Sequence, residues 1–180
     1  MIQPDHIPSR IRRVQEAIAE GRFEDARSEL SAVLDDPRME DYVRDNPGSL
    51  VPVLIITRQY LKAGRAEDAQ RVVERARELA VRFGRDVGRS HYQSAQVYAV
   101  LGASDPAYIE KAAAQLFRAF LANPEFQQWY RNPGPWFDPV RARIDAALGR
   151  MEDPAVVRDR MMARARASAR APTRDRIAER

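Results

Sequence analysis

The chain has 180 residues, contains no cysteine and carries a formal net charge of +4. This length suits one ordinary domain, and the absence of cysteine excludes disulfide bonds, thiolate metal sites and cysteine nucleophiles. The N-terminal residues lack the apolar run of a secretory signal, and the longest apolar stretch is too short to span a bilayer, so we expect a cytoplasmic protein without a membrane span.

A six-residue segment is repeated along the chain. Gly-Arg-Phe-Glu-Asp-Ala begins at Gly21, and Gly-Arg-Ala-Glu-Asp-Ala begins at Gly64. Apolar residues at steps of four and three follow each copy, which places their side chains on one stripe of a helix. These stripes are Ala26, Leu30 and Val33; then Ala69, Val73 and Ala76; and, in a third copy after Gly102, Ala112, Leu116 and Ala119. We expect each glycine to lie where one helix stops and the next begins.

In chain order, the apolar spacing predicts helices and no strand, so the fold class is all-α. The expected helices span residues 9–20, 24–35, 50–63, 67–83, 89–101, 107–122, 138–148 and 153–170. Residues 38–45 are a candidate for a further short helix that tucks Met39, Tyr42 and Val43 against its neighbours. The Asn-Pro-Gly-Pro run at 132–135 excludes regular structure there.

The helix pairs resemble the tetratricopeptide repeat, a helix–turn–helix unit of about 34 residues. The second copy has Val53, Ile56, Thr57 and Tyr60 before its stripe, and the third has His91, Ser94, Ala95 and Tyr98, with Pro124 at its end. The first copy, with Arg10, Arg13, Val14 and Ala17, fits least well. The resemblance implies a right-handed solenoid of antiparallel helical hairpins within a repeat domain at 1–150, followed by a tail at 151–180.

The segment after the third copy resembles a closing segment found in many bacterial tetratricopeptide proteins. It contains Trp129 and the run Pro-Trp-Phe-Asp-Pro-Val-Arg at 135–141. The last repeat of a solenoid exposes an apolar face that needs a cap, and the aromatic residues supply large apolar area for it. We therefore expect Trp129, Tyr130, Trp136 and Phe137 to form a capping cluster with a C-terminal capping helix, rather than an aromatic ligand site.

The tail is rich in arginine and is expected to be helical or partly disordered. From residue 155 onward it holds eight arginines against three acidic residues, whereas the whole chain is only +4. Two valines and two methionines give this basic helix a narrow apolar stripe. The candidate contact residues are Val157, Arg160, Met161, Met162 and Arg164.

A second candidate surface follows from the resemblance, which implies that the first helices of the repeats line a concave groove. The residues at the groove-facing positions predict a polar, mildly basic binding strip, although an ordinary solvated face remains an alternative. They are Gln15, Arg58, Lys62, Tyr92 and Gln96.

No residue pattern indicates catalysis, a metal or a cofactor. The acidic pairs at 24–25 and 67–68 fall in the first turns of helices, where acids complement the helix dipole. Ser90 and His91 are adjacent on a helix and point apart, so they do not form a nucleophile–base pair. The glycines at 84 and 88 are too close for a phosphate loop, and no preceding strand is expected.

The sequence therefore favours a non-enzymatic adaptor or scaffold, one subunit of a larger complex, that binds a partner protein or an acidic peptide through the groove and the tail. The alternative is a nucleic-acid-binding helical repeat. The second copy also resembles the pentatricopeptide unit, which reads single-stranded RNA, and the arginine-rich tail could bind phosphates.

Overall fold

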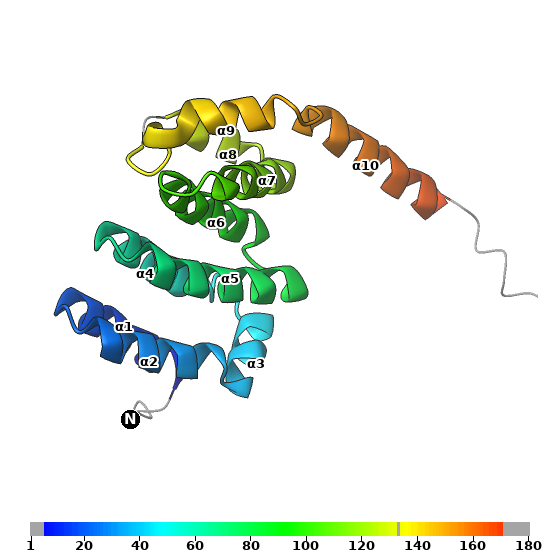
Figure 1. The fold of residues 1–180 in the computed structure, drawn as a ribbon. Helices are drawn as coiled ribbons and strands as arrows, with labels where there is room; N and C mark the ends of the chain where they lie inside the picture. The colour runs from blue at the N-terminus through cyan, green and yellow to red at the C-terminus, as the bar shows by residue number, and fades with distance from the viewer. Residues whose placement is uncertain (1–5, 133, 171–180) are drawn as a thin grey trace, which may run out of the picture.

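The computed structural model describes residues 6–132 and 134–170, with side chains described as far as residue 168. Within these ranges all regular structure is helical, which confirms the all-α prediction (Figure 1). The elements are α1 (Ile7–Ala19), α2 (Phe23–Leu34), α3 (Pro37–Asp45), α4 (Val51–Lys62), α5 (Ala66–Phe83), α6 (Val87–Gly102), α7 (Ala107–Ala122), α8 (Glu125–Arg131), the 3-10 turn η1 (Asp138–Val140), α9 (Arg141–Leu148) and α10 (Pro154–Arg170).

The predicted helices are all present close to their expected ends, and residues 37–45 form the short helix that was a candidate. α1 begins two residues earlier than expected, with Pro8 in its first turn. A proline is tolerated there because the first amides of a helix have no partner within the helix. α8 was not predicted.

The helices pack in sequential pairs, α1 with α2, α4 with α5 and α6 with α7, and the pairs lie one above another (Figure 1). Among the first helices, α4 contacts both α1 and α6, and among the second helices α2 contacts α5. α3 packs against α1 and α5, where it buries Met39 and Val43. The array therefore has one face built from first helices and another built from second helices.

The repeat glycines have two different structural roles. Gly21 and Gly64 have φ of +76° and +73°, a left-handed conformation in which a side chain would be strained, so they turn the chain between paired helices. Gly102 is instead the last residue of α6, and its φ is not positive. A Cβ at Gly102 would lie 2.7 Å from the Cδ1 atom of Ile109, so there the glycine allows α7 to approach α6 closely.

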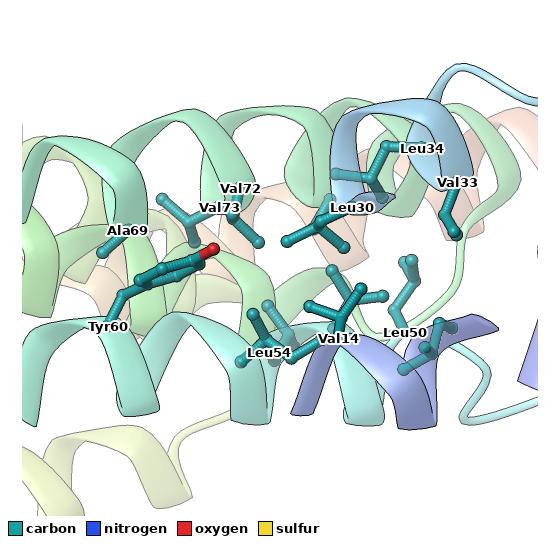
Figure 2. Packing of buried hydrophobic residues seen from close by; sticks show 14 of the residues in the cluster. Val14, Leu30, Val33, Leu34, Leu50, Leu54, Tyr60, Ala69, Val72 and Val73 are labelled. Atoms are coloured by element: carbon teal, nitrogen blue, oxygen red, sulfur yellow. The ribbon is translucent and has the colours of Figure 1, made fainter. Parts of the chain in front are cut away.

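Buried side chains form two apolar clusters. The first spans α1 to α5 and includes Val97 of α6, and the second spans α6 to α9. The repeat alanines Ala26, Ala69 and Ala112 have no exposed surface, as expected for positions where paired helices approach closely. Figure 2 shows Ala69 beside Tyr60 at one such position in the first cluster.

Asp36 follows α2 and forms hydrogen bonds with residues of α1 and α3. Its carboxylate accepts a hydrogen bond at 2.9 Å from the backbone amide of Arg38, which caps α3, and further bonds from the guanidinium groups of Arg38 and Arg10. Arg10 belongs to α1 and also donates to Glu29 of α2 at 2.9 Å. The hydrogen bonds from Arg38 lower the pKa of Asp36 to about 2.

We expect Asp36→Ala to lower the free energy of unfolding by about 1–2 kcal/mol near neutral pH, because α3 loses its cap and Arg10 loses an ion-pair partner. The folded-state pKa of Asp36 lies below its ordinary value of 3.8. Its ionic contribution is therefore complete above about pH 4 and is lost as the pH falls toward about 2. Urea unfolding of both proteins at neutral and acid pH should show the difference shrinking in acid. An unchanged difference would rule out the ionic role.

Candidate interaction surface

The predicted groove residues are not all accessible. Arg58 and Lys62 on α4 are exposed, and Gln15 on α1 is half-buried, with its side-chain amide 3.5 Å from the carbonyl oxygen of Pro52. Tyr92 and Gln96 on α6 are only 7% and 8% exposed. The structure therefore does not form the open five-residue strip expected from the sequence, although the binding role of the exposed members stays a prediction.

Tyr92 is buried because the chain returns over it after α7. We use "closing segment" for residues 125–132 and 134–141, which comprise α8, the following loop, η1 and the start of α9. Three rings of this segment surround the ring of Tyr92, with centroid distances of 5.2 Å to Phe126, 5.8 Å to Trp129 and 5.7 Å to Phe137. Burial raises the pKa of Tyr92 to about 12. The closing segment thus occupies the α6 part of the predicted groove.

Trp136 extends the closing segment to the preceding helix pair. The guanidinium carbon of Arg58 lies 5.4 Å from the centroid of the Trp136 ring, a cation–π contact between α4 and the closing segment. Trp136 packs against the first apolar cluster, while the adjacent Phe137 is a member of the second. Two consecutive aromatic residues therefore join the two clusters.

Arg141 holds the loop of the closing segment in place. Its guanidinium donates to Asp138 Oδ1 at 2.7 Å, to the carbonyl oxygen of Asn132 at 3.2 Å and to the carbonyl oxygen of Tyr130, and it lies over the Tyr130 ring. The other carboxylate oxygen of Asp138 accepts from the amide of Gly134 at 3.0 Å. The hydrogen bond from Arg141 lowers the pKa of Asp138. This geometry explains why an Asp-Pro-apolar-Arg run suits a closing loop.

A local signal for α8 is present in the sequence. Asn123 accepts a hydrogen bond from the amide of Glu125 at 2.9 Å through its side chain, and Pro124 stands directly before the helix. Asparagine followed by proline and an acidic residue is a common helix start. The prediction took Pro124 only as the end of the third copy and did not use this signal.

Three exposed side chains form a small patch on the first helix α4. Ile55 is 44% exposed, and Arg58 and Lys62 follow it at the helical spacing that brings side chains to one side. We call Ile55, Arg58 and Lys62 the α4 patch. Trp129 of the closing segment is also 44% exposed.

The tail forms helix α10, which leaves the stacked pairs and extends away from them (Figure 1). Its start is capped by Asp153, whose carboxylate accepts from the amide of Ala155 at 2.7 Å, and it contacts α7. From residue 159 to residue 168 every side chain is exposed. The tail was expected to be helical or partly disordered, and its last ten residues lie outside the described residues.

The predicted tail contacts fall into two groups. Val157 is half-buried, and Arg160 pairs with Glu152 at 2.7 Å. Met161 and Met162 are 58% and 52% exposed, and Arg164 is exposed near them. The exposed members of the predicted contact are therefore the two methionines, Arg164 and the ion-paired Arg160.

Ser90, His91 and Asp68, which were considered for catalysis, have structural partners. Ser90 donates to the carbonyl oxygen of Val87 at 2.8 Å, whereas His91 Nδ1 lies 2.7 Å from the side-chain oxygen of Gln115. Burial lowers the pKa of His91. Asp68 pairs with Arg65 at 2.7 Å. Within the described ranges no group of three histidine, aspartate or glutamate side chains is placed to hold a metal ion.

Comparison with known proteins adds no assignment. No known protein family, curated protein or solved structure matches this chain, so the likeness to tetratricopeptide repeats is carried by the repeat residues themselves. None of the helices in the described part of the chain combines the length and apolar character needed to cross a bilayer.

Proposed function

We propose that this protein is a non-enzymatic adaptor, built as a tetratricopeptide-like right-handed solenoid, which binds an acidic partner protein through α10. The observation that carries the proposal is the exposure of two adjacent methionines on a helix that extends away from the body. Met161 and Met162 are each more than half exposed.

An extended, solvent-surrounded helix gains little stability from packing, and short isolated helices are marginal in water. Methionine side chains are flexible and adapt to grooves of irregular shape, which makes them common at binding surfaces. Docking of such an amphipathic helix in a groove of a partner would give the helix packing contacts and would bury its methionines. α10 is suited to this mode of binding.

The positive charge of α10 indicates that the partner surface is acidic. Arg158, Arg164 and Arg166 accompany the methionines, and beyond Asp159 no acidic residue lies in the described part of the helix. Guanidinium groups pair with carboxylates in a fixed fork geometry. The partner that fits α10 therefore has an apolar groove with an acidic rim. The α4 patch, with two basic side chains, is a second positively charged contact for such a partner.

Nucleic acid is the alternative partner, and the same arginines favour it because they could pair with phosphates. The two modes differ in their response to salt. Phosphate binding weakens steeply as salt rises, with a log–log slope that grows by about 0.7–0.9 for each contact. A contact through methionines retains an apolar contribution that salt screens little.

The decisive test replaces the two methionines. We expect Met161→Ser with Met162→Ser to weaken binding of the copurifying protein partner by about tenfold or more, because two anchors of the contact lose their apolar area. Nuclease-treated pull-downs across a salt series, quantified by mass spectrometry, measure this loss. Arg58→Glu with Lys62→Glu should give a smaller loss at low salt.

Val81→Ser is the matched control, because Val81 is 56% exposed on α5, a helix that carries neither proposed contact, and its replacement should leave binding unchanged. Equal capture by the methionine variant and the wild type would refute the α10 contact. Tight RNA or DNA binding at physiological salt that disappears with residues 155–180 would favour the nucleic-acid alternative.

A further inference from the structure

Two equivalent tyrosines of the repeats have different surroundings. Tyr60 and Tyr98 each precede the glycine of their copy by four residues, and each belongs to a first helix. The hydroxyl of Tyr98 donates to Glu74 Oε1 at 2.8 Å and lies 3.3 Å from a guanidinium nitrogen of Arg77. Both partners are on α5, the second helix of the preceding copy, so polar side chains bridge that junction.

The junction one copy earlier lacks these partners. Counted from the glycines, Glu74 and Arg77 of α5 correspond to Ser31 and Leu34 of α2. Tyr60 has no exposed surface, yet its hydroxyl has no hydrogen-bond partner among the described residues. Figure 2 shows this hydroxyl directed away from α4, toward Leu30 and Val72 on the two second helices.

A cleft of about 760 Å³ lies at this junction, between α2 and α5. Its apolar lining includes Leu30, Leu34 and Val72, and the buried Tyr60 is also part of the lining. Arg75 lines the cleft too, and its Nε atom is buried without a hydrogen-bond partner in the described structure. The volume falls in the range of small-molecule binding sites.

The Tyr60 hydroxyl and Arg75 Nε each lack a hydrogen-bond acceptor, although Arg75 is ion-paired with Glu78 at 3.1 Å and its Nε lies 3.9 Å from Asp35 Oδ1. A guanidinium Nε–H can only donate. Burial raises the pKa of Tyr60 to about 12, so its hydroxyl keeps its proton at neutral pH and can donate as well. The cleft lining contains three arginines and two aspartates, and two of the arginines, Arg27 and Arg75, also pair with Glu24 and Glu78.

We propose that the α2–α5 cleft binds a small organic carboxylate with an apolar body. The carboxylate takes the place that the Glu74 side chain has in the next copy, accepting hydrogen bonds from Tyr60 Oη and Arg75 Nε. The apolar body packs against Leu30, Leu34 and Val72. This site lies between the second helices α2 and α5, with Tyr60 contributed by α4, and it includes no residue of α10 or of the α4 patch.

The test is calorimetric titration of the full-length protein with octanoate and with 3-phenylpropionate. We expect saturable binding of at least one of them with one site per chain, and at least tenfold weaker binding of octan-1-ol, which has the same apolar body as octanoate without the charge. Tyr60→Phe should weaken carboxylate binding by about tenfold, since it removes one hydrogen bond to a charged group. Its melting temperature should be no lower than that of the wild type, because the lost hydroxyl has no partner.

Ser31→Glu rebuilds the arrangement of Glu74 and should abolish carboxylate binding by placing the protein's own carboxylate in the cleft. Ser104→Glu, the same change at an exposed turn outside the cleft, should leave binding intact. Absence of saturable binding by both acids would overturn the proposal, as would equal binding by the wild type and Ser31→Glu. Binding of a peptide with a free C-terminal carboxylate, without binding of either small acid, would overturn the small-molecule assignment.

Discussion

Replacement of Phe137 by alanine should destabilise the protein by about 3–5 kcal/mol, the usual loss for a buried aromatic ring in a core. Phe137 is only 3% exposed, and its ring lies 5.1 Å from that of Tyr130 and 5.7 Å from that of Tyr92. The substitution removes the central ring of the closing segment and uncovers α6. Urea unfolding followed by circular dichroism measures the change in the free energy of unfolding.

Trp129→Ala is the comparison for this variant. Trp129 contacts the same Tyr92 ring but is 44% exposed, so its loss should have a clearly smaller effect than that of Phe137. If Phe137→Ala unfolded at the same urea concentration as the wild type, the closing segment would have no part in the core.

Arg141→Met should lower the free energy of unfolding by about 2–3 kcal/mol. Methionine keeps much of the apolar stem but leaves the carbonyl oxygens of Tyr130 and Asn132 and the carboxylate of Asp138 without their donor. Hydrogen bonds to charged groups contribute about 1.5–3 kcal/mol, and an acceptor left without its partner costs more when it is buried. We expect the loop that carries Trp136 to loosen.

Tryptophan fluorescence is a direct measurement of that loosening, because the only two tryptophans, Trp129 and Trp136, both belong to the closing segment. Their emission should shift to longer wavelength in Arg141→Met under native conditions. Arg150→Met is the control, since Arg150 forms an exposed ion pair with Glu110 of the kind that contributes about 1 kcal/mol or less. Equal stability and emission in the two variants would contradict the role of Arg141.

These variants also bear on where a partner can bind. With the closing segment in place, Tyr92 is buried and Arg58 faces Trp136, so the accessible candidates are the α4 patch and α10. If loosening the loop by Arg141→Met strengthened partner binding while the wild type bound weakly, the covered part of the groove would be the true contact.

The local pattern of residues was sufficient to predict the helices other than α8. Steps of three and four between apolar residues specify a helix because they place those side chains on one stripe, and this period is a property of a short segment alone. The same holds for the turns at Gly21 and Gly64, where a left-handed backbone favours glycine. The burial of the repeat alanines and the role of the aromatic residues as a cover also followed from the sequence.

Which side chains stay accessible was decided by tertiary structure. Tyr92 and Gln96 stand at positions that the repeat pattern directs to an open face, yet a segment more than thirty residues later in the chain folds over Tyr92. Likewise, Tyr60 and Tyr98 are equivalent in sequence, but only Tyr98 meets partners, because Glu74 and Arg77 on a different helix reach it. Helical periodicity determines the face on which a residue lies, whereas its burial and hydrogen bonding depend on contacts between distant segments that no local pattern contains.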